Sequence, residues 1–305
     1  MLRPTGYIDG GIAPLEEIRV PVLDRGFLYG DSVYEVFRTY AGIPFLFAEH
    51  HARLQNSARL CRMQITQSEE EIMDAIRKTV AASGAAYKAA GDDIYVRYQI
   101  TRGEGPVDLF PHPDLRTRLI IIVKQVPQWP PEFYEHGVTL AIPTVRRNSV
   151  GALDPNIKGG NYLNNILGLA EARALGADDC LLLDADGMVT ECSNSNIWFV
   201  LNGKLATPAA GNLSGITRRA LVGELVRAGH SEVERPLRAD ELPSATECFI
   251  TSATREVMPV ARLRLQDGAT LDFPPGGGEC TRLARRLYSD MLARFTREHS
   301  GEAWF

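Results

Sequence analysis

The sequence predicts an α+β protein made of two domains. Strand-like runs alternate with helical patterns in the first part of the chain, and short apolar runs joined by turns fill much of the second. Between them lies VPQWPPEFYEHG, whose prolines remove backbone donors and hold the chain extended. The 305 residues, 45% of them hydrophobic, suffice for two moderate cores. We therefore expect a small N-terminal α+β domain over 1–125, a linker over 126–136 and a larger domain over 137–305.

In the first domain, four strand-like runs and two helical patterns follow one another. The runs YEVFRTY and IPFLF come first, and DIYVRYQITRG and RLIIIVKQV come last. The segments AEHHARLQNSARLCRM and SEEEIMDAIRKTVAASG, which lie between them, carry the apolar spacing of amphipathic helices. This order of elements is typical of an α+β unit.

In the second domain, the pattern indicates meandering antiparallel strands with helices packed outside them. The domain opens with the strand-like run VTLAIPTV. The apolar runs CLLLDADGMV and SNIWFVLNGKLAT are interrupted at DADG and LNG by turn chemistry that suits hairpins. Helices are predicted from Tyr162 to Leu175, from Ile216 to about Gly229 and from about Glu279 to Arg297.

Charge and hydropathy argue against nucleic-acid and membrane partners. The formal net charge is -5, with both signs scattered along the chain, so no basic stripe follows a phosphate backbone. The N-terminus, MLRPTGYIDGG, has no apolar leader region, and no stretch approaches the roughly 20 apolar residues that span a bilayer. We expect a cytoplasmic location.

Neither cysteines nor histidines form a pattern that binds metal. The five cysteines are far apart and never form a C-x-x-C pair, which favours reduced thiols over disulfides or zinc ligands. His50 and His51 are adjacent and would point about 100° apart on a helix, so we expect a surface pair. No metal site is predicted.

Lys158 is the first residue that points to a chemistry. In NIKGGNYLNNI it is followed by two glycines and then by a helical pattern, which places it at a strand-to-helix turn with backbone freedom beside it. Such a position lets an amine project into a cavity. Taken alone, a lysine is usually a solvated surface charge, so other features must support this interpretation.

Two turns offer backbone amides to an anion. In LSGITRR, the amides of Ile216 and Thr217 begin a helix and have no intrahelical acceptors, an arrangement that binds phosphate readily. Capping by Ser214 or Thr217 is the simpler alternative for this segment. The turn TSAT at 251–254 brings further amides, although most such turns only end a strand.

Glu191 adds a carboxylate in largely apolar surroundings, in MVTECSNSNIWFV. A buried carboxylate needs a partner. A lysine that can form an imine, amides for a phosphate and a buried acid together describe a pyridoxal-phosphate site, where the acid keeps the ring nitrogen protonated. We therefore expect pyridoxal 5'-phosphate as the cofactor.

At this point the sequence resembles the fold-type IV pyridoxal-phosphate enzymes. The likeness runs from about Tyr7 to beyond Val260, and its core is KGGNYLNNILGLAEARALGADDCLLLDADGMVTECSNSNIWFV followed by LSGITRR. It implies a fold similar to that of D-amino acid aminotransferase, with a small α/β sandwich domain and a larger pseudo-barrel domain. It also implies a transaminase.

The resemblance carries roles onto particular residues. It makes Lys158 the Schiff-base lysine and proton carrier, and Glu191 the partner of the pyridine nitrogen. It has Tyr162 bind the cofactor's phenolic oxygen and Arg53 bind its phosphate. The other implied cofactor residues, which offer amides or hydroxyls, are Ile216, Thr217, Ala253 and Thr254.

The implied reaction has two half-reactions and ping-pong kinetics, with a branched-chain L-amino acid as donor and 2-oxoglutarate as acceptor. The pair Tyr95-x-Arg97 resembles the branched-chain group of the family, and FLYGDSVYEVFRTY falls on that group's active-site positions with a tyrosine in place of a usual phenylalanine. The implied substrate-binding residues are Tyr29, Tyr34, Arg38, Tyr95, Arg97, Ala253 and Thr254.

Other substrates stay open. LDRGFLYGD resembles the D-amino-acid group, but Val107 and Leu109 stand where that group has its arginine and histidine. Arg25 or Arg255 would then be the replacement guanidinium for a D-amino-acid donor, or either is a structural residue. An (R)-amine transaminase, an aminodeoxychorismate lyase and a non-catalytic cofactor-binding protein are further alternatives.

The resemblance also implies a homodimer whose active site is near the subunit interface. The segment expected to reach the partner subunit is the loop TRGEGPVDLFPHP, which is rich in glycine and proline and bears apolar side chains. An internal flexible loop is the alternative.

Overall fold

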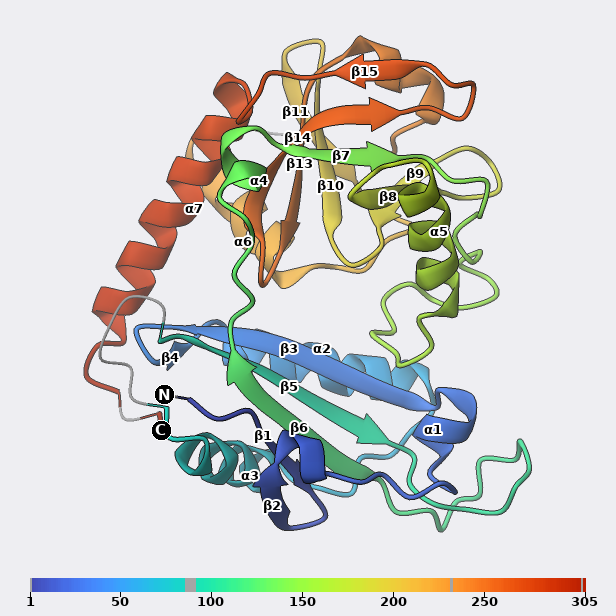
Figure 1. The fold of residues 1–305 in the computed structure, drawn as a ribbon, viewed down its shortest axis with the longest axis vertical. Helices are drawn as coiled ribbons and strands as arrows, with labels where there is room; N and C mark the ends of the chain where they lie inside the picture. Colours follow the sequence, from blue (N-terminus) through green and yellow to red (C-terminus); the bar gives the residue numbers. More distant parts are fainter. Residues whose placement is uncertain (1, 86–91, 231–232, 303) are drawn as a thin grey trace. The chain divides into compact units, whose positions relative to one another are not determined.

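The computed structural model describes residues 2–85, 92–230, 233–302 and 304–305, which divide into two compact units (Figure 1). The first unit comprises Met1–Pro127, Ile157–Asn161 and Phe295–Phe305. The second comprises Gln128–Asn156 and Tyr162–Arg294. Two segments of the range 137–305 thus belong to the first unit, whereas the expected domains were contiguous.

The first unit is built on an antiparallel sheet of six strands in the order β2-β1-β6-β5-β3-β4. Strand β3 pairs with β5 along its length, from Ser32 opposite Thr101 to Arg38 opposite Tyr95. On its other side, β3 pairs with β4 only at Thr39 and Tyr40. The strands are β1 (Thr5–Ile8), β2 (Gly11–Pro14), β3 (Ser32–Tyr40), β4 (Ile43–Pro44), β5 (Ile94–Thr101) and β6 (Arg118–Gln125).

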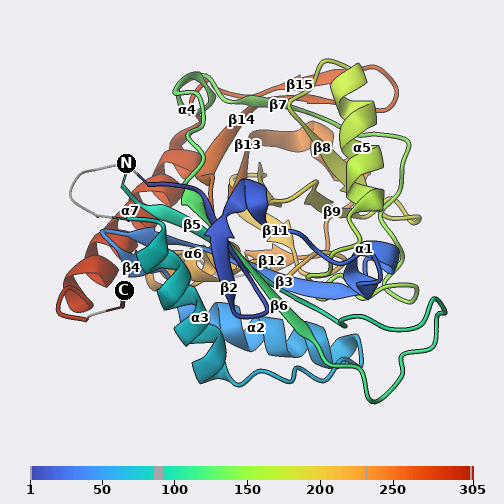
Figure 2. The same cartoon turned by 60° about the horizontal axis from the view of Figure 1, so that its bottom comes forward.

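Two helices cover one face of this sheet (Figure 2). Every second residue of β5, beginning at Ile94, packs with apolar residues of these helices, because side chains alternate across a strand. Ser68 and Glu71 form a capping box that starts the second helix. The helices of the unit are η1 (Leu15–Glu17), α1 (Arg25–Tyr29), α2 (Phe47–Leu60) and α3 (Glu69–Ala82).

The segment before β3 and the run IPFLF differ from the sequence predictions. The hairpin of β1 and β2, whose register pairs Thr5 with Pro14, was not predicted. In IPFLF only Ile43 and Pro44 form a strand, and α2 begins at Phe47. Both hairpin strands are four residues long, which is too short for a clear periodicity.

The second unit contains a nine-stranded sheet in the order β12-β11-β10-β13-β14-β7-β8-β9, with β15 paired to β14. The last strand in this order, β9, contacts β10 and β11, so the sheet curls back on itself as a pseudo-barrel does. Its strands are β7 (Val138–Ala141), β8 (Asp179–Leu183), β9 (Val189–Cys192), β10 (Asn196–Leu201), β11 (Lys204–Pro208), β12 (Glu234–Arg235), β13 (Ala245–Ser252), β14 (Glu256–Arg264) and β15 (Thr270–Asp272). The predicted hairpins at DADG and LNG are β8-β9 and β10-β11.

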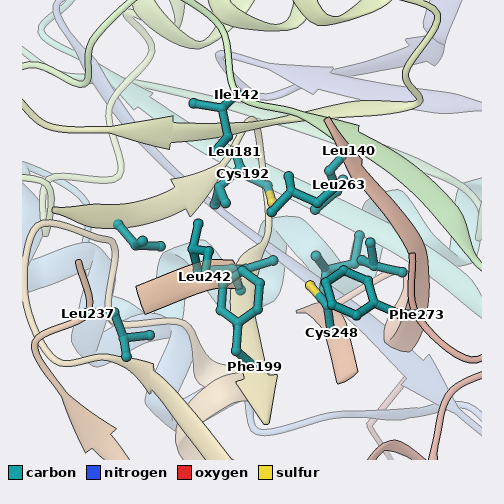
Figure 3. Close-up of a cluster of buried hydrophobic side chains, with 14 of the residues drawn as sticks. Leu140, Ile142, Leu181, Cys192, Phe199, Leu237, Leu242, Cys248, Leu263 and Phe273 are labelled. Atoms are coloured by element: carbon teal, nitrogen blue, oxygen red, sulfur yellow. The ribbon is translucent and has the colours of Figure 1, made fainter. Parts of the chain in front are cut away.

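The core of the second unit lies inside the curled sheet (Figure 3). Phe199, Cys248 and Leu263 are among its fully buried side chains, and all five cysteines of the chain are free thiols. The predicted helices are present, and the mixed architecture of two units is confirmed. The helices are α4 (Glu132–Glu135), α5 (Leu163–Ala174), α6 (Ile216–Arg227), η2 (Ala239–Ser244) and α7 (Glu279–Glu298). Within the described parts of the chain, none of the helices has the length and apolar character to cross a bilayer.

Candidate active site

Lys158 is held against the edge of β3 by backbone hydrogen bonds. Its carbonyl accepts from the Tyr34 N–H at 2.9 Å, and the Gly160 N–H donates to the Ser32 carbonyl at 2.8 Å. The Lys158 N–H donates to Ser57 Oγ of α2 at 3.1 Å. A Cβ at position 160 would collide with Ser32 Oγ, so the close approach requires glycine there. The lysine is therefore fixed by a glycine-dependent segment beside a strand.

The Lys158 amine lies beside an aromatic ring. Its Nζ is 3.3 Å from the Tyr34 hydroxyl and 4.5 Å from the centre of that ring. The guanidinium carbon of Arg97 lies 3.6 Å from the same ring centre, and Arg97 donates to Gln99 Oε1 at 2.8 Å. Because an aromatic face attracts cations, Tyr34 brings the lysine and Arg97 together.

Four of the predicted substrate residues share one face of the β3-β5 pair. The register sets Val36 opposite Arg97 and Arg38 opposite Tyr95, and Tyr34 follows the same alternation. The pKa of Tyr95 is raised, because the effect of burial outweighs the opposite effect of the neighbouring Arg97. The Tyr95 hydroxyl therefore stays protonated and can donate a hydrogen bond. The structure thus brings together Tyr34, Arg38, Tyr95 and Arg97.

On the opposite face of β3, a buried carboxylate holds Arg53. Glu35 is fully buried, and its two oxygens accept from Arg53 Nε at 2.6 Å and Nη2 at 2.8 Å. His50 Nδ1 lies 2.7 Å from Glu35 Oε2. An ionised carboxylate only accepts hydrogen bonds, so Nδ1 must carry the histidine proton. Glu35, His50 and Arg53 therefore form one hydrogen-bonded group.

The charges of this group follow from burial and pairing. Burial alone would raise the pKa of Glu35, but Arg53 and His50 outweigh it and lower that pKa to about 2. Burial lowers the pKa of His50 despite Glu35, so this imidazole is neutral near pH 7. The prediction that His50 and His51 form a surface pair is wrong, because both side chains are buried on α2. No cluster of potential metal ligands occurs among the residues that the structure describes.

In the second unit, Glu191 is a buried carboxylate on β9 with an arginine partner. Its Oε1 accepts from Arg147 Nη2 at 2.9 Å and from Nε at 3.2 Å, and its Oε2 accepts from the Leu213 N–H at 3.1 Å. Arg147 also donates to Asn164 Oδ1 at 3.3 Å. These donors stabilise the ionised form of a carboxylate and fix its orientation.

Helix α6 begins without a side-chain cap. Its N-cap residue is Gly215, not Ser214 or Thr217, so the capping alternative of the sequence is wrong. A Cβ at position 215 would collide with Asn196 Oδ1, which explains the glycine. The first-turn amides of Ile216 and Thr217 therefore keep their capacity to bind an anion.

The TSAT turn joins β13 to β14. Ala253 and Thr254 lie in the turn itself, and the Thr254 carbonyl accepts from Trp129 Nε1 at 3.0 Å. The Thr251 hydroxyl accepts from Trp198 Nε1 at 3.0 Å and so has a structural partner. Tyr162 precedes α5 as its N-cap residue.

Comparison with known proteins identifies the family. A family model described as amino-transferase class IV matches residues 32–263. The chain belongs to the class IV aminotransferases. This family depends on pyridoxal phosphate, so the protein is a pyridoxal-phosphate-dependent transaminase.

Individual relatives of this aminotransferase have two kinds of name. It is 33% identical over 291 residues to a putative branched-chain-amino-acid aminotransferase of Methanocaldococcus jannaschii, which covers 95% of this chain and 96% of the relative. It is also 33% identical over 264 residues to a D-alanine aminotransferase of Listeria monocytogenes, covering 84% and 86%.

Solved structures agree with the fold. The branched-chain amino acid aminotransferase of Escherichia coli superposes with a TM-score of 0.84 at 26% identity, covering 95% of each chain. An aminotransferase from Brucella abortus, solved with bound pyridoxal phosphate, has a TM-score of 0.80 at 27% identity and covers 95% of this chain and 99% of that one. The expected fold-type IV architecture is thereby confirmed.

In this aminotransferase, Arg25 and Arg255, the two arginines considered as receptors for a donor carboxylate, pair with residues of their own units. Arg25 is buried and donates to the Asp108 carbonyl at 2.9 Å, and its guanidinium carbon lies 5.0 Å from the ring centre of Tyr29. Arg255 Nη1 donates to Asp179 Oδ2 at 3.1 Å and to Asn194 Oδ1 at 2.5 Å. Both guanidiniums have structural partners, which favours the structural interpretation over a substrate receptor.

The structure adds three residues that the sequence did not single out as site residues. Glu35 and His50 hold Arg53, and Arg147 holds Glu191. The sequence distances between partners are 15, 18 and 44 residues, so no local motif connects them. The only available signal was Glu35 itself, an acidic residue in a largely apolar strand.

The predicted residues are distributed over both units. Those of the first unit are Tyr29, Tyr34, Arg38, Arg53, Tyr95, Arg97 and Lys158. Those of the second unit are Tyr162, Glu191, Ile216, Thr217, Ala253 and Thr254.

The low pKa of Glu35 predicts a pH-dependent stability. Since the folded-state pKa is about 2 against an ordinary 4.5, the native carboxylate binds fewer protons than the unfolded one, and its stabilisation is complete above about pH 4.5. It should be lost as the pH falls from about 4.5 to 2, and it corresponds to about 3 kcal/mol. Urea unfolding followed by circular dichroism should show the Glu35→Gln variant less stable at pH 7, with the difference vanishing near pH 2. A difference that is constant over this range would contradict the assignment.

Proposed function

We propose that this transaminase transfers the amino group of a branched-chain L-amino acid to 2-oxoglutarate, with the cofactor bound as a Schiff base to Lys158. The observation that carries the proposal is the position of Lys158. Its main chain is fixed by hydrogen bonds to β3, and its amine lies beside Tyr34 on the polar face that Tyr34 shares with Tyr95 and Arg97. A surface lysine would lack such a setting.

The residues present suit pyridoxal phosphate. Lys158 supplies the amine, and Arg53 supplies a guanidinium for the phosphate, with the first-turn amides of α6 left uncapped at Gly215. Glu191 is buried and accepts hydrogen bonds from Arg147, an arrangement that suits a partner for a protonated pyridine nitrogen. In this proposal Tyr162 binds the phenolic oxygen, and the turn of Ala253 and Thr254 contributes amides.

When bound, the cofactor supplies an electron sink for the carbon that loses its proton. Lys158 then has two tasks. Its Nζ would hold the cofactor until the amino donor takes that place, and as a free amine it would move the proton from the donor's α-carbon to the cofactor carbon that Lys158 had held. The Tyr34 hydroxyl, 3.3 Å from Nζ, orients the free amine for this transfer. Release of the first oxo product before the acceptor binds gives ping-pong kinetics.

The polar face of β3 and β5 is the proposed receptor for substrate carboxylates. Arg97 is fixed by the Tyr34 ring and by Gln99, which limits the entropy lost on binding an anion. The protonated Tyr95 hydroxyl adds a neutral donor. Tyr29 and Arg38 complete the set that we propose for the substrate.

A D-amino-acid donor is the second candidate. The similarity to the Listeria D-alanine aminotransferase, at the same 33% identity as the first relative, favours it. Arg25 and Arg255 are the two arginines that would replace the missing carboxylate receptor. Both donate hydrogen bonds to other residues of the protein, which argues against this candidate.

We also infer a homodimer. In the loop TRGEGPVDLFPHP, the side chains of Val107, Leu109 and Phe110 are 72, 79 and 62% exposed, and Val22 and Phe27 of the same unit are also exposed. Several exposed apolar side chains within one loop are typical of an interaction surface. Arg25 anchors this loop through the Asp108 carbonyl, so the loop has a defined attachment.

The proposed donor is tested by adding one amine at a time to the cofactor-loaded protein. L-Leucine and L-valine should discharge the visible band of the bound cofactor quickly, and D-alanine and (R)-1-phenylethylamine slowly. The Lys158→Ala variant should form no such band and lose at least about 10³-fold of its activity, whereas Lys78→Ala, at an exposed position of α3, should behave as wild type. A preference for D-alanine would replace the proposal by the second candidate, and pyruvate release from aminodeoxychorismate without an acceptor would indicate a lyase.

The Tyr34 hydroxyl should affect turnover. Tyr34→Phe removes a hydrogen bond to a charged or reacting amine, so kcat should fall about tenfold with little change in the donor KM. The control is Tyr98→Phe on the other face of β5, where the hydroxyl is buried without a hydrogen-bond partner within the described chain. Equal kcat values for Tyr34→Phe and wild type would contradict the proposed role.

The dimer is tested by sedimentation. Wild type should sediment as two chains, and Leu109→Asp should shift the distribution toward one chain because a charge cannot be buried without a partner. Val226→Asp, which changes an exposed residue of α6 outside the loop, serves as the control. A wild type that sediments as a single chain at all concentrations would refute the inference.

A further inference from the structure

Glu35, the carboxylate that accepts hydrogen bonds from Arg53, was given no role in the reaction proposed above. Glu35 is fully buried on the helix-facing side of β3, and both of its oxygens are used by Arg53 and His50. Burying an ionised carboxylate is costly unless it is paired and hydrogen-bonded. A nonpolar residue would fill this core position at less cost, so the charge calls for a reason beyond packing.

The contact fixes the plane of the Arg53 guanidinium. Glu35 takes the edge formed by Nε and Nη2, at 2.6 and 2.8 Å, and a planar guanidinium bound along one edge has its Nη1 side turned away from the carboxylate. His50 in turn fixes Glu35 through Nδ1 at 2.7 Å. Because burial keeps His50 neutral, it contributes a hydrogen bond without competing for the negative charge.

The same two elements also hold Lys158. On α2, the residues His50, Arg53 and Ser57 are spaced three and four apart and share one face of the helix. Ser57 accepts from the Lys158 N–H, and the N–H of Tyr34, which precedes Glu35 on β3, donates to the Lys158 carbonyl. The β3-α2 pair thus fixes both the proposed phosphate-binding arginine and the lysine within the first unit.

We propose that Glu35, supported by His50, is a positioning residue that orients Arg53 toward the cofactor's phosphate at a set distance from Lys158. This inference rests on the proposed function of Arg53. Glu35 cancels most of the charge of Arg53, so Arg53 acts through its oriented N–H donors more than through net positive charge. Orientation and charge then have separable effects on the affinity for the cofactor.

The variants Glu35→Gln and Glu35→Asp separate these effects. Glutamine removes the charge and places an N–H group against a guanidinium that only donates, so Arg53 must turn. Aspartate keeps the charge and withdraws the carboxylate by one methylene. If orientation matters, both variants bind pyridoxal phosphate more weakly. If charge alone matters, glutamine strengthens phosphate binding and aspartate leaves it unchanged.

The decisive comparison uses pyridoxal, which lacks the phosphate, beside pyridoxal phosphate. The dissociation constant of pyridoxal phosphate, measured from the visible band of the bound cofactor, should rise about tenfold in both variants. That of pyridoxal should change less than about twofold. The phosphorus NMR signal of the bound cofactor should also move toward that of the free cofactor. The control is Glu247→Gln, which removes another buried carboxylate, one that accepts from the Thr281 N–H at 2.8 Å at the start of α7.

The possible outcomes are distinct. An equal loss for pyridoxal and pyridoxal phosphate, or an unchanged affinity in Glu35→Asp, would overturn the positioning role. Glu247→Gln should lower thermal stability without separating the two ligands. If Glu35→Gln does not fold, Glu35→Asp decides, since it keeps the ion pair. A wild-type protein that forms no visible band with pyridoxal phosphate would refute the proposed function itself, before any variant is compared.

Discussion

The side of β3 that lies away from β5 determines the position of Lys158. Strand β5 pairs with β3 along one side, whereas β4 reaches only its last residues, so the backbone groups near Ser32 and Tyr34 need other partners. The segment with Lys158 satisfies them, and Gly160 permits its close approach. Lys158, the proposed reactive residue, is therefore placed by main-chain hydrogen bonds, which depend little on the side chains nearby. This explains why a segment far along the chain packs with the first unit.

Several buried charges in this protein occur as pairs. Glu35 is paired with Arg53, Glu191 with Arg147, and Asp179 with Arg255. Each pair costs desolvation energy that a nonpolar core would avoid, but each also fixes a side chain in one orientation. In two of the pairs one member is a proposed cofactor contact, so the second member determines how that contact is presented. The third pair gives Arg255 a structural partner, which favours a structural role for it over a substrate contact.

The helices of both units and the hairpins of the second unit could be predicted from the sequence because their signals are local. Apolar spacing marked α2 and α3, and turn residues marked β8-β9 and β10-β11. Lys158 and Glu191 were singled out from their local sequence, and a likeness that spans most of the chain gave them their expected roles. Their partners were not found, because Arg147 is 44 residues from Glu191 and no local pattern joins them. His50 and His51 were misjudged because their polarity suggested solvent, whereas α2 buries both of them.

Strand β3 carries two different constraints on alternate residues. Val33, Glu35 and Phe37 face the helices and are fixed by packing and by the ion pair, while Tyr34 and Arg38 face the polar surface beside Lys158. In the proposed site, exchange at position 38 would therefore alter the contacts made to the donor without disturbing the side chains that pack against the helices. Insertion or deletion of a single residue within β3 would move the helix-facing side chains to the polar face and the polar-face side chains to the helices. New specificity can therefore evolve along this strand by substitution, but not by a change in the length of the strand.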